Sequence, residues 1–178
     1  MANFATTDLL GDPSQASWQQ QNLVTVTAPN GQKWQVYREA APAFQAFLQE
    51  LSANGYNPTS SGGFNYRNIR GSNQLSQHAF GAAIDINAAA NPMGGTTSDM
   101  PADVGAIAAK YGIEWGGNWT GRKDPMHFEW TGKGYTPQTN GLAQTQPQPQ
   151  PQQTNALAPL PQIAMLDPAN LPRNRLRA

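Results

Sequence analysis

Two short motifs hold the only two histidines of this chain, and together they constrain its fold more than any other feature. The first motif covers residues 76–87 and reads SQHAFGAAIDIN, and the second covers residues 124–130 and reads DPMHFEW. Imidazole nitrogens and a carboxylate oxygen are good zinc ligands, and three such ligands leave a fourth tetrahedral position open for water. We therefore expect a fold that brings His78 and His127 together around one catalytic zinc ion, with a carboxylate as the third ligand.

The composition excludes several other kinds of site. The 178 residues include no cysteine, which rules out disulfides and cysteine-based zinc fingers. Basic and acidic residues number 11 each, and a formal net charge of zero gives no support for a nucleic-acid-binding surface. No apolar run reaches the roughly 18 residues of a membrane span. Residues 1–20 also lack the charged start and apolar core of a secretory signal peptide.

The order S-x-H-x-x-G-x-A-x-D followed by D-x-x-H-F-E resembles the zinc peptidases of bacterial cell walls. That family includes D-alanyl-D-alanine carboxypeptidases and dipeptidases of vancomycin resistance, and L-alanyl-D-glutamate endopeptidases of phage endolysins. The resemblance extends over residues 36–130 and includes GGFNYR at residues 62–67 and WGGNW at residues 115–119. It implies an α+β fold of the hedgehog/D,D-peptidase type, in which a small antiparallel sheet with helices packed on one side surrounds one zinc site. The resemblance also implies that His78, Asp85 and His127 are the three zinc ligands.

Local patterns predict the elements of this fold. An Asn-Gly turn at residues 30–31, between two alternating stretches, predicts a β-hairpin. Apolar residues at helical spacing predict a helix over residues 41–53, with its apolar stripe in the core. The other predicted elements are a buried strand at residues 82–86, a helix at residues 101–111 with Asp99 as its N-cap, and strands at residues 113–115 and 126–130.

The chain divides into four predicted regions. Residues 1–22 are polar and rich in glutamine, and we expect an arm with little structure of its own. Residues 23–135 form the predicted zinc peptidase domain, in which residues 60–63 are a flexible approach to the first motif. Residues 136–155 are a Pro/Gln-rich linker that we expect to be extended. Residues 156–178 are apolar, interrupted by prolines and basic at the end, which is typical of a docking peptide.

Two acidic residues of the second motif compete for one catalytic role. Asp124 precedes His127 by three residues, a spacing that can place a carboxylate beside a metal-bound water while the imidazole binds the metal. The resemblance implies that the acidic residue at this position is the general base and then the general acid. Glu129 shares a strand face with His127 and is the alternative, although we interpret it as a residue that orients a ligand or a backbone group.

Further polar and aromatic residues near the motifs are candidates for substrate contacts. Arg67 matches an arginine of the family and is predicted to stabilise the oxyanion of amide hydrolysis, or to bind a substrate carboxylate. Arg70 is the alternative for that role. Ser76 is predicted to make a hydrogen bond to the substrate or to a ligand residue, because no third histidine is present to activate it as a nucleophile. Three tryptophans either line a substrate groove or fill the core: Trp115, Trp119 and Trp130.

The resemblance implies zinc-dependent hydrolysis of a peptide bond in the stem of bacterial peptidoglycan. The GGFNYR and HFE segments and the missing signal peptide favour the L-alanyl-D-glutamate endopeptidase branch. A D-alanyl-D-alanine carboxypeptidase is the first alternative, and a phage virion or tail structural protein with a peptidase-like domain is the second. We expect the protein in a phage particle, or in the host cytoplasm before release to the periplasm and cell wall. Residues 156–178 are expected to bind a phage structural protein.

Overall fold

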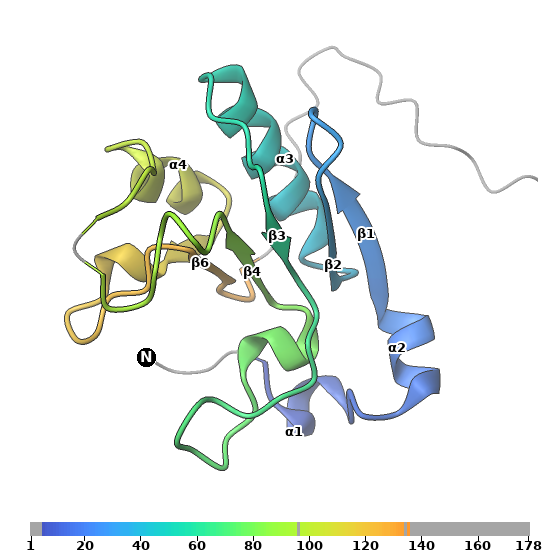
Figure 1. Cartoon of the computed structure of the whole chain (residues 1–178). Helices are drawn as coiled ribbons and strands as arrows, with labels where there is room; N and C mark the ends of the chain where they lie inside the picture. Colours follow the sequence, from blue (N-terminus) through green and yellow to red (C-terminus); the bar gives the residue numbers. More distant parts are fainter. Residues whose placement is uncertain (1–4, 96, 134, 136–178) are drawn as a thin grey trace, which may run out of the picture. The chain divides into compact units, whose positions relative to one another are not determined.

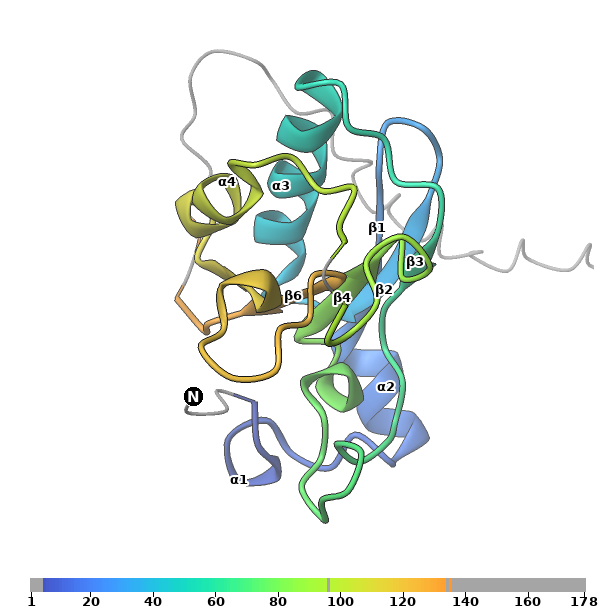
Figure 2. The ribbon, with the colours of Figure 1, turned by 60° about the vertical axis from the view of Figure 1, so that its left-hand side comes forward.

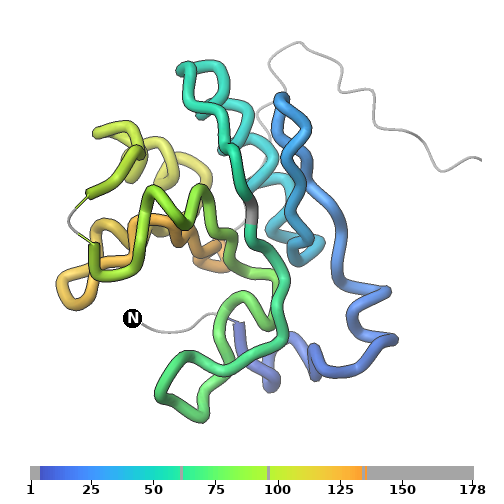
Figure 3. Tube along the Cα trace, in the orientation of Figure 1, coloured from blue at the N-terminus to red at the C-terminus, as the bar shows by residue number. Residues whose placement is uncertain are grey.

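The computed structural model describes residues 5–95, 97–133 and 135 of the chain. The predicted linker at residues 136–155 and the predicted docking peptide at residues 156–178 lie outside the described residues. The described elements, drawn in Figures 1 and 3, follow this order: α1 (Thr7–Leu10), α2 (Ala16–Asn22), β1 (Leu23–Thr27), β2 (Lys33–Tyr37), α3 (Ala41–Ala53), β3 (Ser61–Gly62), the 3-10 helix η1 (Gln77–Phe80), β4 (Ala83–Ile86), α4 (Val104–Lys110), β5 (Ile113–Trp115), the 3-10 helix η2 (Gly116–Asn118) and β6 (His127–Trp130).

Two small antiparallel sheets form the β structure, so the predicted α+β class is confirmed. β1 and β2 make the predicted hairpin, and the second sheet has the strand order β3-β4-β6-β5. The helices α3 and α4 contact each other and lie together above the four-stranded sheet in the views of Figures 1 and 2. The expectation that residues 60–63 are a flexible approach is wrong for Ser61–Gly62, because this pair forms β3 and hydrogen-bonds to β4.

The period of two along the strands gives the four-stranded sheet two different faces. One face is apolar and belongs to the core: Ile84, Ile86, Ile113, Phe128 and Trp130 are buried there. The opposite face carries polar residues at positions that are paired across the strands: Asp85 with His127, and Glu114 with Glu129. The polar residues of β4 and β6 are therefore brought together by ordinary strand pairing, over a sheet whose other face is anchored in the core.

The helix α3 has the bounds that its sequence pattern predicts. Pro42 lies in the first turn, where a missing N–H costs no hydrogen bond. Phe44, Phe47, Leu48 and Leu51 are all fully buried. The ring centroids of Phe47 and Phe128 are 4.9 Å apart, so the apolar stripe of the helix packs on the core face of β6. The interpretation of this stripe as core packing is confirmed.

The N-terminal segment differs from the expected arm with little structure. Where they are described, residues 1–22 form α1 and α2 and contribute to the core. The Trp18 indole N–H donates a hydrogen bond to the Leu10 carbonyl, and the Trp18 ring stacks on Tyr37 with centroids 6.2 Å apart. The polar composition of the segment hid this packing, because Trp18 is the one buried residue of α1 and α2.

The α4 region differs from the prediction at its N-terminus. The helix begins at Val104 rather than at residue 101, and Asp99 is not its N-cap. The Asp99 carboxylate instead accepts hydrogen bonds from the Tyr56 hydroxyl, at 2.7 Å, and from Asn91 Nδ2, at 2.6 Å. This polar cluster holds the loop after β4 and competes with capping for the same carboxylate. Within the described residues, no helix combines the length and apolar character needed to cross a membrane.

Candidate metal centre

His78 is held by a tight turn between β3 and β4. It lies in η1, whose N-cap Ser76 accepts a hydrogen bond from the His78 backbone N–H at 3.3 Å. The turn ends at Gly81, which has a φ of 69°. A side chain there would place its Cβ 2.6 Å from the Tyr37 backbone nitrogen, so both the conformation and the close packing require glycine. The sequence SQHAFG therefore specifies the turn that presents the His78 imidazole.

The structure brings His78, Asp85 and His127 together. Three atoms meet there, His78 Nε2, His127 Nδ1 and Asp85 Oδ1, and each of the three separations between them is 3.2 Å. Ligand atoms that are each about 2.0–2.2 Å from a tetrahedral ion lie roughly 3.3–3.6 Å apart. The spacing therefore matches the triangular base of a tetrahedral metal site with small adjustments.

Each imidazole ring is oriented by a hydrogen bond at its outer nitrogen, so that His78 Nε2 and His127 Nδ1 face Asp85 Oδ1. His78 Nδ1 lies 2.9 Å from the Gly63 carbonyl oxygen, and His127 Nε2 lies 3.3 Å from Glu129 Oε2. Both oxygens are acceptors, so each outer nitrogen carries a hydrogen and donates it. The inner nitrogens are then available as lone-pair donors, which is the usual arrangement around histidine metal ligands.

The electrostatics of this cluster favour a positive charge at its centre. Burial lowers the pKa of His127, but hydrogen bonds and charge from Asp85 and Glu129 outweigh it and raise the pKa to about 9. Burial alone would raise the pKa of Asp85, yet hydrogen bonds from His127 and His78 hold it well below its usual range. Without a metal, imidazole N–H groups hold these atoms together, and a bound cation would take the place of their hydrogens. The donor set of two imidazoles and one carboxylate fits zinc.

Asp124 lies beside this cluster with an unused acceptor atom. It is only 4% exposed, and its Oδ1 has no hydrogen-bond partner among the described residues. Burial is the largest cause of the raised pKa of its carboxyl group. A buried carboxylate oxygen without a partner is costly unless another group uses it, and Asp124 is one of the residues that line the cavity beside the candidate metal ligands.

A cavity of about 200 Å³ opens over the cluster. Five of the residues predicted from the sequence to act beside the metal line it, namely Arg67, Ser76, Trp119, Asp124 and Glu129. Arg70 is exposed and does not line it. The Arg67 side chain is also exposed, with Nη1 3.5 Å from the Asn68 carbonyl oxygen.

Three cavity-lining residues were not among the sequence candidates: Ile69, Gln77 and Met93. Ile69 and Met93 are apolar and unusually exposed, at 38% and 45%. Nothing in their local sequence signals a binding role. Gln77 directly precedes His78, and this position is the one feature of the sequence that could have indicated its place in the cavity lining.

The tryptophans divide between the core and the cavity. Trp130 is 2% exposed and belongs to the core. Trp115 packs on Phe128, with ring centroids 6.4 Å apart and an interplanar angle of 19°. Trp119 alone of the three lines the cavity, and its ring centroid is 5.4 Å from that of His127. The alternatives left open by the sequence are therefore decided differently for neighbouring tryptophans.

Residues 70–130 match the model of a peptidase family described as D-alanyl-D-alanine carboxypeptidase. This stretch is similar to that peptidase family and makes up about a third of the chain. The match includes both histidine motifs and therefore all three metal-binding candidates, which confirms the family resemblance that the motifs indicate. Searches of curated proteins and of solved structures gave no match. The matched stretch thus carries a group of side chains that can hold a metal ion.

Proposed function

We propose that this protein is a zinc-dependent peptidase that hydrolyses a peptide bond in the stem of bacterial peptidoglycan. The observation that carries the proposal is the set of three candidate ligand atoms 3.2 Å apart, next to a buried carboxylate oxygen that has no partner among the described residues. A structural metal site would be closed by four protein ligands, whereas this one has three candidates and a cavity beside them.

The residues divide the work of amide hydrolysis. When bound, zinc acts as a Lewis acid that polarises the scissile carbonyl and lowers the pKa of water to about 7. Asp124 takes a proton from the attacking water and delivers it to the leaving amine nitrogen. Glu129 holds the His127 ring through Nε2. The Arg67 guanidinium stabilises the charge that develops on the carbonyl oxygen.

The first experiment tests the metal and the reaction together. Purified protein should contain about one zinc per chain by elemental analysis. His78→Ala and His127→Ala should each lose the stoichiometric zinc and the cleavage of purified peptidoglycan. Retention of full zinc by both variants would show that the site is wrongly assigned.

A matched pair of arginine variants tests the oxyanion role. Arg67→Lys should lower turnover, because an ammonium group cannot reproduce the planar guanidinium. Arg70→Lys is the control, since Arg70 is exposed and lies outside the cavity lining. Equal turnover in the two variants would remove Arg67 from the catalytic residues.

Two bonds in the stem peptide are candidates for cleavage. The motif context favours the bond between L-alanine and D-glutamate, whereas the description of the matched family favours removal of the terminal D-alanine. Mass spectrometry of digested muropeptides separates them. Endopeptidase action leaves L-alanine on muramic acid and releases peptides that begin with D-glutamate, and carboxypeptidase action releases free D-alanine. A chain that cleaves no wall preparation with zinc present would support a phage structural role instead.

We also propose that residues 156–178 bind a structural protein of a phage particle, with residues 136–155 as a spacer. The support is compositional, because apolar residues and three arginines follow a Pro/Gln-rich stretch. Deletion of residues 140–178 should leave cleavage of soluble wall fragments intact and abolish incorporation into particles. Normal incorporation of the shortened protein would contradict this proposal.

A further inference from the structure

Trp119 lines the cavity, and its ring contacts His127, one of the candidate metal ligands. It follows η2 directly, is partly exposed, and its ring plane is inclined at 55° to that of His127. The two residues before Asn118 in this segment are Gly116 and Gly117, which offer no side chains to support the indole. Contact with one imidazole leaves the indole free to rotate about its own side-chain bonds, so a second contact is needed to fix it.

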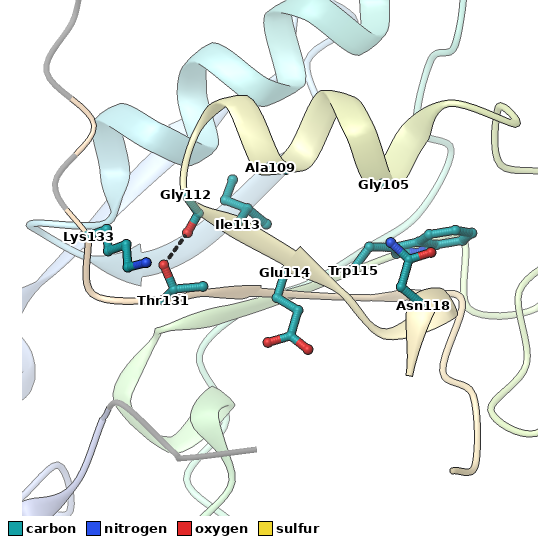
Figure 4. A pocket seen from close by; sticks show the side chains of 9 residues that line it. All are labelled: Gly105, Ala109, Gly112, Ile113, Glu114, Trp115, Asn118, Thr131 and Lys133. Carbon is teal, nitrogen blue, oxygen red and sulfur yellow. Dashed lines mark hydrogen bonds between the residues drawn. The ribbon is translucent and has the colours of Figure 1, made fainter. Parts of the chain in front are cut away.

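Glu114 supplies that second contact. Its Oε1 accepts a hydrogen bond from Trp119 Nε1 at 3.1 Å. Glu114 lies in the middle of β5 and is paired in register with Glu129 of β6. Figure 4 shows the Glu114 side chain pointing away from α4, on the opposite side of β5 from Ile113. It therefore extends from the sheet face that also carries His127.

Two other residues that line the cavity are apolar. Ile69 and Met93 line the same cavity as Trp119, and both are exposed to a degree that is unusual for large apolar residues in this structure. The cavity lining therefore combines metal-binding candidates and acidic groups with three apolar side chains, those of Ile69, Met93 and Trp119. Of these, only Trp119 has a hydrogen-bonding atom by which a neighbour can set its position.

We propose that Glu114 is a positioning residue that fixes Trp119 as a wall of the substrate cavity and so controls how a peptide seats beside the metal-binding residues. The inference rests on the proposed peptidase function in one respect, that the cavity receives a peptide. A hydrogen bond to a carboxylate is roughly twice as strong as a neutral one, which makes Glu114 an effective anchor for the indole N–H.

Kinetics of four variants test the anchor. Glu114→Ala removes the acceptor and Trp119→Phe removes the donor, so each should raise KM for a stem peptide about tenfold with a smaller change in kcat. The double variant should be no worse than the more affected single variant, because both changes break one hydrogen bond. Glu114→Gln keeps an acceptor oxygen and should recover most of the loss. Additive effects of the two single changes would overturn the proposal.

A measurement without substrate separates this inference from the proposed function. Acrylamide quenching of tryptophan fluorescence should increase in Glu114→Ala and stay unchanged in Glu39→Ala, a control at an exposed glutamate. The increase should vanish when Glu114→Ala is made in the Trp119→Phe background. If wild-type protein cleaves no peptide, the proposed function fails while this measurement still tests the anchor. Unchanged quenching in Glu114→Ala would refute the inference.

Zinc titration supplies the remaining control. Glu114→Ala should bind zinc with the wild-type affinity, since the proposed role concerns the cavity wall and not the metal ligands. A large loss of zinc affinity would mean that Glu114 acts through Glu129 and His127, and the proposal would then be wrong.

Discussion

Replacement of Gln77 should loosen the start of the N-terminal segment at Ala5. The Gln77 side-chain amide makes a reciprocal pair of hydrogen bonds with the backbone of Ala5: the Ala5 N–H donates to Oε1 at 3.1 Å, and Nε2 donates to the Ala5 carbonyl at 3.2 Å. Ala5 is 2% exposed and Gln77 is 4% exposed. Gln77→Ala therefore leaves the buried N–H and carbonyl groups of Ala5 without these two hydrogen bonds.

The magnitude follows from burial. Each hydrogen bond contributes about 0.5–1.5 kcal/mol net, and a buried group left without a partner costs about 1–3 kcal/mol. Ala5 can limit this loss by moving into water, at the expense of its own packing. We therefore expect Gln77→Ala to lower the free energy of unfolding by about 1–3 kcal/mol.

Urea denaturation followed by circular dichroism measures this change, and hydrogen exchange at the Ala5 amide locates it. Gln74→Ala is the matched control, because Gln74 is exposed and close by, and it should change stability by less than about 0.5 kcal/mol. If Gln77→Ala is no less stable than this control, or if exchange at Ala5 is not faster, the reasoning is refuted.

Three further changes test the metal centre and a surface ion pair. Asp124→Asn should keep zinc but lower kcat by about 10²-fold or more, and steady-state kinetics with normal turnover would reject its role as the base. Glu129→Gln should weaken zinc affinity about 10–100-fold in competition with a chelator, whereas wild-type affinity would show that the contact to His127 does not support the ligand. The hydrogen bonds from Lys110 and Tyr111 lower the pKa of Glu50 from 4.5, so its stabilising effect is present at neutral pH and is lost as the pH falls through the folded-state pKa. Thermal melts should therefore show a larger loss on acidification in the wild type than in Glu50→Gln, and parallel losses would contradict this.

Local patterns predicted the elements whose signals do not depend on distant residues. The β1–β2 hairpin follows from an Asn-Gly turn between alternating stretches, and α3 follows from a helical apolar stripe with Pro42 at its start. The strands β4 and β6 each begin one residue later than predicted, at Ala83 and His127. These elements succeed because turn geometry and periodicity are properties of the chain itself.

Long-range contacts account for the features that local patterns missed. The N-terminal helices are ordered by Trp18 packing on Tyr37 and by the Ala5 backbone pairing with Gln77, 72 residues away. β3 forms because Ser61–Gly62 pairs with the edge of β4 that β6 does not occupy. Aspartate is a typical N-cap residue, yet the Asp99 carboxylate accepts hydrogen bonds from Tyr56 and Asn91 instead. None of these partners can be chosen from the neighbouring sequence.

The sequence by itself indicated which residues are candidates for metal binding. Two histidines and one aspartate, in motifs that resemble a peptidase family, specify the ligand types, because ligand chemistry is a property of residue identity. Only the tertiary structure decided how His78, Asp85 and His127 meet at 3.2 Å, because that separation depends on the pairing of β4 with β6 and on the η1 turn. It also decided that Trp119 faces the cavity while Trp130 fills the core, because the face a side chain occupies is set by strand register and packing.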